Sequence, residues 1–422
     1  MAKLRNVPRP DKANRTIHLI KVEGINGNNN KYYDMYDTGD GNFFVFFGRV
    51  GADPQIEQYP ISRWDSKYRE KLSDRKGYKD ISNLRIDSTS TQQFIDITDA
   101  SVAKFIADLQ RYASNLVSKT YLVSAGAVTL AQIEEAQAIL DNLMLFISDS
   151  YYKNSIADRY VREVNEILTK LFTVIPRKMK HVKDHLISVK DETILKEIIS
   201  NEQDNLDTME SQVKTHQLQQ QNVNTSISIL DAMGLKISVV GNDIQTALKS
   251  KLGENSRQFR KAFNVINTKT QRRFDDYVAA CKNKRIEELY HGSRNSNWWS
   301  ILGGGLMIKP TNAVHTGSMF GNANYFASLA KKSIGYTSLS GSYWARGGDS
   351  VAYLAVYSAH LGNAYVVHQQ EHEHYSFNYE KLRKRGEYDS MHAKAGRSLY
   401  NDEFMIYKVE QSTVRYIIEI GN

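Results

Sequence analysis

Four short segments in the C-terminal half of this chain carry side chains that could bind a substrate and act on it. They are His291-Gly292-Ser293-Arg294, Tyr325-Phe326-Ala327, the stretch from Lys332 to Tyr336, and Asn401-Asp402-Glu403-Phe404. Together they supply a histidine, two tyrosines, a serine and a carboxylate, each on an apolar, strand-like or glycine-rich segment. Such a set suits a pocket that holds a flat aromatic amide and two riboses.

In this order and context, the segments resemble the His-Tyr-Glu signature of the poly(ADP-ribose) polymerase family, which cleaves NAD+ and transfers ADP-ribose. The resemblance implies that NAD+ is bound as a substrate. It implies that the NAD+-binding residues are His291, Gly292, Ser293, Asn297, Tyr325, Phe326, Lys332, Ser333 and Tyr336, and that Glu403, His291 and Tyr325 serve catalysis.

Recognition of nicotinamide needs hydrogen bonds to its carboxamide and a flat surface for its ring. By resemblance, the Gly292 backbone and the Ser333 hydroxyl bind the carboxamide, Tyr336 stacks on the ring, and Tyr325 closes the opposite side. Residues 325 to 336 are expected to form the end of a strand and the following helix. That arrangement would bring both aromatic side chains to one pocket.

The remaining signature residues are expected to hold the rest of the dinucleotide. His291 resembles the family residue that bonds a ribose hydroxyl, and Ser293 and Asn297 stand where the family contacts the adenosine half. Met307 occupies a position that is often arginine in DNA-dependent members. The resemblance therefore predicts one contact fewer to the pyrophosphate or the adenosine.

Glu403 is the predicted catalytic group. Cleavage of the nicotinamide–ribose bond develops positive charge on the ribose, as in glycoside hydrolysis. A carboxylate bonded to a ribose hydroxyl stabilises that charge and can orient an acceptor. Asp402 and Glu410 are nearby alternatives, but strand alternation places Asp402 on the opposite face, and the sequence from Glu403 to Tyr407 matches the family's glutamate strand.

Two other kinds of site are less well supported. Gly303-Gly304-Gly305 is the densest glycine run, but it is not part of a dinucleotide-binding or phosphate-loop motif. His372-Glu373-His374, with His368 nearby, could suggest a metal, yet no cysteine or third spaced ligand supports it. We expect these histidines to be solvated loop residues and predict no metal.

The composition limits the class of protein. At 422 residues, two to four domains are expected. A single cysteine, Cys281, excludes an internal disulfide and fits a reducing compartment. Neither a signal peptide nor a membrane-spanning run is visible. We expect a nuclear protein in a eukaryote and otherwise a cytoplasmic or nucleoid one.

Residues 1–88 are predicted to form a small β-rich module. Aromatic and β-branched runs at 31–36 and 43–47 flank a glycine-containing turn, which indicates a hairpin, and Trp64 to Leu72 is expected to be helical. Residues 1–85 hold 16 Lys and Arg against 11 Asp and Glu, so much of the net charge of +8 lies there. A basic module favours a polyanionic partner.

The order of motifs in this module resembles a WGR domain. The matching segments are 30–33, Phe47-Gly48-Arg49-Val50-Gly51 and Lys76-Gly77-Tyr78, with Phe47 in place of the family's tryptophan. The resemblance implies that Arg49 and Lys76 contact phosphates at a DNA end.

Residues 89–225 are predicted to form an all-α bundle. Thr129 to Gln132 fits a capping box, and helices are expected at 161–172 and 192–213. The fragment Leu171 to Pro176 resembles a hallmark of the helical regulatory domain of DNA-dependent members. The Gln/Asn-rich stretch 217–226 is expected to be a surface loop or linker.

Residues 226–422 are expected to form a mixed transferase fold with antiparallel-rich sheets, including strands at 351–357, 403–407 and 414–420. No βαβ alternation indicates a parallel doubly wound sheet. The prediction is thus an α+β multidomain protein: a WGR-like DNA-binding module (1–88), a helical regulatory domain (89–225) and an ADP-ribosyltransferase domain (226–422).

The implied activity is transfer of ADP-ribose from NAD+ to protein or nucleic-acid acceptors, stimulated by DNA ends or nicks, with release of nicotinamide. The protein itself is a possible acceptor, and a monomer is expected away from DNA. Because only Met391 to Leu399, with Lys394 and Arg397, precedes the glutamate strand, short poly(ADP-ribose) is expected. The alternatives are transfer of single ADP-ribose units, or a DNA-binding adaptor with a degenerate transferase domain.

Overall fold

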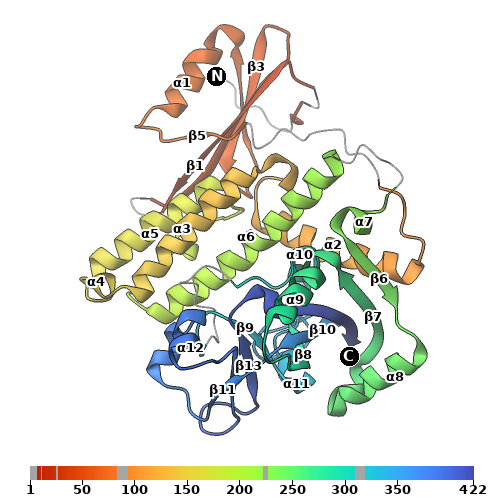
Figure 1. The fold of residues 1–422 in the computed structure, drawn as a ribbon. Helices are drawn as coiled ribbons and strands as arrows, with labels where there is room; N and C mark the ends of the chain where they lie inside the picture. Colours follow the sequence, from red (N-terminus) through yellow and green to blue (C-terminus); the bar gives the residue numbers. More distant parts are fainter. Residues whose placement is uncertain (1–6, 11, 25–26, 83–93, 222–226, 309–318) are drawn as a thin grey trace. The chain divides into compact units, whose positions relative to one another are not determined.

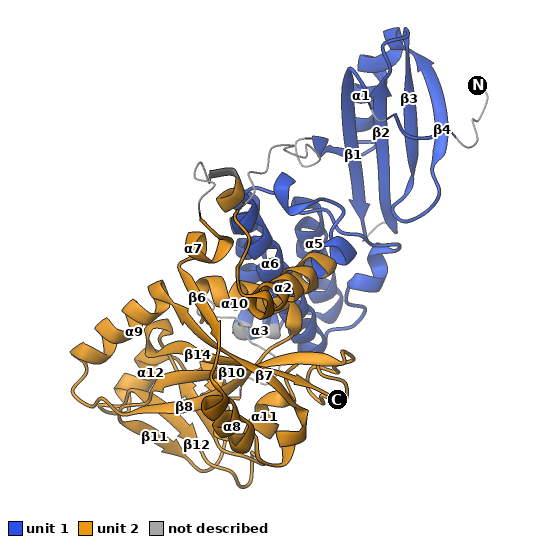
Figure 2. Ribbon diagram, turned by 90° about the vertical axis from the view of Figure 1, so that its right-hand side faces the viewer, with its two compact units in different colours: residues 1–90, 116–216 blue, residues 91–115, 217–422 orange. Residues whose placement is uncertain are grey.

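The computed structural model describes residues 7–10, 12–24, 27–82, 94–221, 227–308 and 319–422. The chain forms two compact units, residues 1–90 with 116–216 and residues 91–115 with 217–422 (Figure 2). Two of the boundaries fall inside helices, α2 (Ala100–Thr120) and α6 (Glu192–Gln221). The division into three domains at residues 88 and 225 therefore stays a prediction.

The first unit begins with a five-stranded antiparallel sheet in the order β4-β3-β2-β1-β5. Its elements are β1 (Arg15–Glu23), β2 (Asn29–Asp37), β3 (Asn42–Arg49), β4 (Gln55–Pro60), α1 (Trp64–Leu72) and β5 (Lys79–Asp80). The predicted hairpin joins β2 to β3, with Gly39 and Gly41 at φ of 80° and 84°, and the predicted helix at 64–72 is confirmed.

Both faces of this sheet carry aromatic side chains. Phe43, Tyr33 and Trp64 pack on the face that α1 covers, and Tyr36 and Phe46 pack on the other. This packing explains why the module is so rich in aromatic residues: its two small cores are built largely from them.

The rest of the first unit is helical (Figure 1). Its helices are α3 (Leu130–Ser148), α4 (Ser150–Lys153), α5 (Ala157–Val174) and the greater part of α6. The capping box is confirmed, because the Thr129 side chain accepts from the Gln132 N–H while the Gln132 side chain accepts from the Thr129 N–H. The prediction of a loop from residue 217 was wrong: α6 continues to Gln221, and 222–226 lie outside the described residues.

The second unit contains two sheets. The first has the order β6-β7-β14-β10-β8 and is antiparallel throughout; the second has the order β11-β12-β13-β9, in which β11 and β12 are parallel. The strands are β6 (Leu235–Val239), β7 (Phe259–Asn267), β8 (Ile286–Gly292), β9 (Asn324–Phe326), β10 (Val351–His360), β11 (Ala364–Val367), β12 (Ser390–Ala393), β13 (Glu403–Ile406) and β14 (Ser412–Gly421). The antiparallel-rich α+β prediction for this region is confirmed.

Short helices connect these strands. They are α7 (Ile229–Met233), α8 (Asn242–Lys251), α9 (Thr268–Ala280), α10 (Trp298–Gly304), α11 (Ala330–Ile334) and α12 (Tyr379–Lys384). An antiparallel bridge between Tyr290 and Ala327 links β8 to the segment after β9, so the two sheets meet at the signature residues. No helix among the described residues is long and apolar enough to cross a membrane.

One helix of the predicted regulatory region belongs to the core of the second unit. Phe105 of α2 stacks on Phe263 of β7 at 4.4 Å between ring centroids, and it also contacts Tyr353 of β10. Val102, Ile106 and Leu109 share the same buried cluster. The first part of α2 is therefore an integral layer of this unit.

Candidate active site

The signature histidine and tyrosine are joined directly. His291, at the end of β8, contacts the carbonyl oxygen of Tyr325 in β9 through Nδ1 at 3.0 Å. Because a carbonyl can only accept, Nδ1 carries the proton and Nε2 is left as an acceptor. Burial lowers the pKa of His291, although this hydrogen bond opposes the shift. A neutral imidazole with a free acceptor nitrogen suits a ribose hydroxyl.

Gly292 lies against the helix that carries Ser333. A Cβ atom at position 292 would be 1.8 Å from the Ser333 carbonyl oxygen, so only glycine allows this approach. The Ser333 hydroxyl donates to the Tyr290 carbonyl at 3.0 Å and keeps its acceptor lone pairs. The two residues predicted to hold a carboxamide are thus adjacent.

The two predicted pocket tyrosines are both half-buried. The Tyr325 hydroxyl donates to the Gly321 carbonyl at 2.7 Å and accepts from the Phe320 N–H at 3.1 Å, which fixes its ring. Tyr336 follows α11, and burial together with the charge of Glu403 raises its pKa to about 12. Both phenols therefore stay neutral at ordinary pH.

Glu403 opens β13 and is 6% exposed. Its Oε1 forms an ion pair with Lys332 Nζ at 2.6 Å, and Lys332 also donates to the Asn401 carbonyl at 3.2 Å. The other oxygen, Oε2, is buried without a hydrogen-bond partner among the described residues. A buried acceptor without a partner is costly, so this oxygen is poised for a hydroxyl donor from a bound molecule.

The alternative carboxylates differ from Glu403. Asp402 accepts from His392 Nε2 at 2.6 Å, from Lys394 Nζ at 3.1 Å and from the Ala395 N–H at 2.8 Å. Although burial opposes the change, these three donors lower the pKa of Asp402 to about 2. Its role is to hold the loop before β13. Glu410 lies in a 3-10 turn between β13 and β14, after the strand that Glu403 opens.

The residues predicted for the adenosine half form a separate small group. Asn297 donates through Nδ2 to the Ser293 hydroxyl at 3.2 Å, directly before α10. Met307 is 59% exposed after α10. Phe326 is buried between His291 and Tyr357, so it positions the histidine ring by packing.

Two features of the site escaped sequence reasoning. Lys332 was predicted as an NAD+ contact, but its ion pair with Glu403 was not, because the two residues lie far apart in the chain. Trp344 packs nearly parallel to Tyr336, at 15° with ring centroids 6.1 Å apart. The adjacent exposed aromatics Tyr343 and Trp344 in a Ser/Gly-rich segment were the available signal.

The histidine cluster has structural contacts. His374 is buried beside Phe320 and Phe377, and its Nδ1 accepts from the Glu371 N–H at 2.9 Å. Over the described part of the chain, no group of three or more His, Cys, Asp and Glu side chains is arranged to hold a metal ion. The expected solvated loop is wrong for His374, which is 3% exposed.

The two residues predicted to contact DNA are engaged within the first unit. Arg49 Nη1 donates to the Asn28 carbonyl at 2.7 Å and lies 3.5 Å from the Lys180 carbonyl. Lys76 lies 4.0 Å from Glu70. Phe47, at the position of the expected tryptophan, packs on Tyr33. The structure does not bring Arg49 and Lys76 into one contact.

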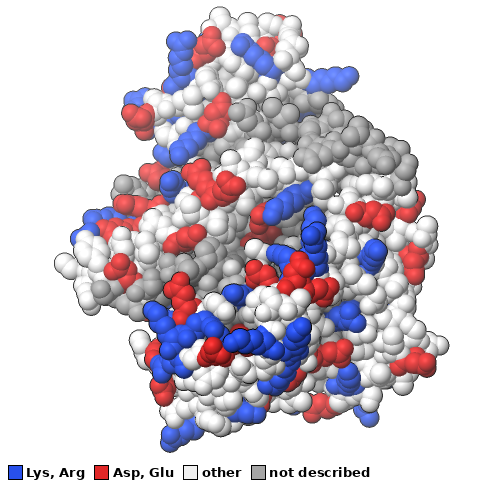
Figure 3. Space-filling model, viewed as in Figure 1, with Lys and Arg blue, Asp and Glu red and all other residues white. Residues whose placement is uncertain are grey.

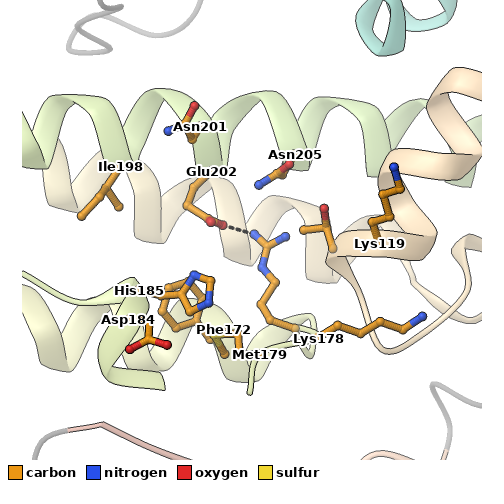
Figure 4. Close-up of a pocket in the computed structure, with 12 residues that line it drawn as sticks. Lys119, Phe172, Lys178, Met179, Asp184, His185, Ile198, Asn201, Glu202 and Asn205 are labelled. Atoms are coloured by element: carbon orange, nitrogen blue, oxygen red, sulfur yellow. Dashed lines mark hydrogen bonds and ion pairs between the residues drawn. The ribbon is translucent and has the colours of Figure 1, made fainter. Parts of the chain in front are cut away.

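A cavity of about 380 Å³ lies among the helices of the first unit (Figure 4). It is built around Arg177, whose guanidinium pairs with Glu202 of α6 and lies 4.0 Å over the Tyr121 ring. Asp184 and His185 line the opposite side. None of the signature residues lines this cavity, so it is distinct from the site around Glu403.

Charges of both signs are mixed on the face drawn in Figure 3. The clearest group of one sign lies over α12, whose last turn holds Lys381, Arg383 and Lys384. Two of these are engaged, since Lys381 donates to Ser376 and Arg383 lies 3.9 Å from Asp389. The described charges on this face are thus dispersed.

Comparison with known proteins matches this part of the chain to one family. The family model described as "Poly(ADP-ribose) polymerase catalytic domain" matches residues 241–422. Uncharacterized protein 101L of Invertebrate iridescent virus 6 is 35% identical over 202 residues, covering 48% of this chain and 80% of that protein. Putative poly [ADP-ribose] polymerase-like 100L of the same virus is 34% identical over 163 residues, covering 38% of this chain and 84% of that protein.

A plant relative extends the similarity over almost the whole chain. Poly [ADP-ribose] polymerase 2 of Zea mays is 25% identical over 502 aligned residues, which cover 98% of this chain and 73% of that protein. The matched catalytic region contains His291, Tyr325 and Glu403 in one site. The chain belongs to the poly(ADP-ribose) polymerase family and is an NAD+ ADP-ribosyltransferase with NAD+ as its substrate.

Proposed function

We propose that this transferase is stimulated by DNA ends or nicks and adds short poly(ADP-ribose) to protein acceptors, itself included, or to nucleic acid. The observation that carries the catalytic part is the carboxylate of Glu403. One of its oxygens is paired with Lys332 and the other is buried without a partner among the described residues.

Glu403 acts on the ribose of NAD+. Its Oε2 accepts a hydrogen bond from a hydroxyl of the nicotinamide ribose as the bond between C1′ and the nicotinamide nitrogen breaks. The electron pair of that bond leaves with nicotinamide, and the carboxylate stabilises the positive charge on the ribose. An acceptor oxygen then bonds to C1′, and the proton of the acceptor passes to bulk water. Lys332 holds the carboxylate in place.

His291 and the nicotinamide-side residues position the substrate. The neutral imidazole accepts from a ribose hydroxyl through Nε2, because Nδ1 is committed to the Tyr325 carbonyl. The close approach of Gly292 to Ser333 leaves backbone groups and a hydroxyl for the carboxamide. Tyr325 and Tyr336 then enclose the ring.

Four observations support a DNA partner for residues 1–88. The segment carries a surplus of Lys and Arg, and the similarity to the maize relative covers 98% of the chain, so it includes this module. The segments that resemble a WGR domain lie in β2, at the end of β3 and directly before β5. Arg49 has further guanidinium nitrogens beyond the one bonded to Asn28.

The helical part is proposed to restrain catalysis until DNA binds. Because α2 supplies Phe105 to the core of the second unit, a deletion that starts at residue 91 would unfold this core. A fair test removes only 116–216 and joins the ends with a flexible linker. Activity near the DNA-stimulated level without DNA supports restraint, whereas unchanged dependence on DNA contradicts it.

The length of the product depends on the loop before β13. Lys394 is held by Asp402, and Arg397 Nη1 donates to Gln369 at 3.2 Å, so both cations have partners inside the protein. A second subsite for a growing chain would have to share them, which favours short chains.

One experiment tests the whole proposal. The purified protein is incubated with labelled NAD+, with and without nicked DNA, and the product is detached from protein and sized. Short polymers that increase with DNA support the proposal. Single units alone exclude elongation, and equal labelling without DNA excludes stimulation.

A further inference from the structure

A loop between α11 and β10 presents two aromatic side chains to solvent. Tyr343 is 77% exposed and Trp344 is 60% exposed, and their rings meet edge to face at 4.8 Å. Large exposed aromatic groups that lie together commonly mark a binding surface. Neither residue belongs to the family signature or to the core.

The loop is firmly held, so this exposure is built into the fold. The backbone N–H groups of Trp344 and Ala345 both donate to the Gly335 carbonyl, at 3.0 and 3.1 Å. The buried Ser342 hydroxyl donates to the Ile334 carbonyl at 3.0 Å. A Cβ atom at position 347 would lie 2.2 Å from the Leu339 carbonyl oxygen, so the loop also depends on Gly347.

The base of the loop is fixed in the same way. Ser340 and Asp349 are joined by a backbone hydrogen bond of 2.8 Å, and Asp349 also donates to the Ser338 carbonyl at 2.9 Å. The side chain of Asn295, which follows the signature histidine motif, donates to the Asp349 carboxylate at 2.9 Å. The loop is thus tied at both ends to the elements that carry the active site.

A cation stands beside the two rings. Arg346 is exposed, and in the described part of the chain no hydrogen bond or ion pair engages its guanidinium. Its φ of +48° is the only positive value at a non-glycine residue among the described ranges. A strained position that persists often serves a function.

The surroundings of the rings favour a flat, charged ligand. With Tyr343, Trp344 and Arg346, the residues lining an open hollow of about 670 Å³ are Gly341, Ser342 and Gly347. No aliphatic side chain lines it, so an apolar protein segment would find few partners. A nucleobase needs only an aromatic face, and the next phosphate needs a cation.

We propose that Tyr343, Trp344 and Arg346 form a stacking platform for single-stranded nucleic acid beside the active site. The bases stack on Trp344 and Tyr343, and a phosphate pairs with Arg346. Since Trp344 also packs on Tyr336, a strand held there lies next to the expected nicotinamide subsite. This inference concerns the binding of a strand. It rests on the proposed function only in placing the platform beside the active site.

Tryptophan fluorescence provides a direct test. Of the four tryptophans, Trp298 and Trp299 are fully buried and Trp64 is 4% exposed, so Trp344 is the one open to a ligand. Addition of a single strand of about twelve nucleotides should quench the emission of the full-length Glu403→Gln protein. An excess of unlabelled nicked duplex occupies any site on the N-terminal module. The quenching should disappear in the variant that also carries Trp344→Phe.

Affinity for a fluorescein-labelled strand, measured in the same background, completes the test. Trp344→Ala and Tyr343→Ala should each weaken binding about fivefold to a hundredfold. Arg346→Ala should reduce the slope of log affinity against log salt by about 0.7, as expected for one lost phosphate contact on a single strand. Tyr375→Ala, a tyrosine 48% exposed in the same unit, is the matched control and should change nothing.

Several results would overturn the platform. Two results would place the strand elsewhere. One is that the affinities of the three variants stay within twofold of the parent, and the other is that nicked duplex displaces the strand completely. Failure of the strand to quench Trp344, combined with quenching by free ADP-ribose, would make the occupant a nucleotide product. Failure of DNA to stimulate transfer would leave the quenching result intact, so the two proposals fail separately.

Discussion

The predicted residues behave differently in the two units. In the second unit, four distant segments converge, so that His291 bonds Tyr325, Gly292 touches Ser333, and Glu403 pairs with Lys332. In the first unit, Arg49 bonds a neighbouring loop and Lys76 lies beside a surface glutamate. The same kind of motif reasoning therefore identified side chains that contact one another in one unit and two separate side chains in the other.

The difference lies in the type of interaction that each motif encodes. A pocket for a dinucleotide needs side chains from several strands at fixed positions, so its signature constrains the whole sheet. A phosphate contact needs only a cation on a surface, and an arginine there can as well bond a carbonyl of its own protein. Contacts between distant signature segments are thus stronger structural evidence for a site than a single cation on a surface.

The largest expected effect is that of Glu403→Gln. It should lower kcat about 10²-fold to 10⁴-fold, because the carboxylate acts on charge that develops in the transition state. Binding of a non-hydrolysable NAD+ analogue, followed by calorimetry, should change little. Glu410→Gln is the control and should retain activity. Equal losses in binding and rate would show that Glu403 has a structural role. The contacts between the signature segments would then not form a catalytic site.

Lys332→Met should come next. It leaves the buried Glu403 carboxylate without its partner, which should lower the free energy of unfolding by about 3 kcal/mol. Chemical denaturation measures this effect. The double variant with Glu403→Gln should recover much of the loss, because the unpaired charge is then gone. Additive losses would contradict a direct coupling between the two side chains.

Acidification should weaken the loop before β13. The pKa of Asp402 falls from 3.8 to about 2 on folding, so its stabilisation is complete above pH 3.8 and is lost as the pH falls towards 2. The full shift corresponds to about 2.5 kcal/mol, and partial exposure reduces the expectation to about 1–2 kcal/mol. Unfolding of the parent and of Asp402→Asn should therefore converge between pH 4 and pH 2. Parallel curves would show that Asp402 is not held by these donors.

Arg49→Ala and Lys76→Ala should have the smallest effects on stability. Loss of its bond to the Asn28 carbonyl should cost about 1 kcal/mol, and Lys76→Ala should cost less than about 0.5 kcal/mol. If Arg49 also contacts DNA, stimulation by nicked DNA should fall while the basal rate stays. A loss of stability with unchanged stimulation would confine Arg49 to a structural role and deepen the contrast between the units.

Local features of this protein followed from the sequence alone. The capping box at Thr129 involves residues three apart, the β2–β3 hairpin is closed by a short glycine-containing turn, and α1 spans the predicted residues. The signature residues were also identified from the sequence, because the family signature consists of residue types in a fixed order along the chain. Neighbouring residues can meet in only a few ways, so their spacing predicts their contacts.

Contacts between distant segments were decided by the tertiary structure. The register of β12 and β13 leaves Asp402 with His392 and Glu403 with Lys332, although both carboxylates are adjacent in sequence. Packing of Phe105 on Phe263 places the first part of α2 in the second unit, against the composition boundary near residue 89. An amphipathic helix or a charged side chain specifies what it needs to contact, and only the assembled sheet determines which partner supplies that contact.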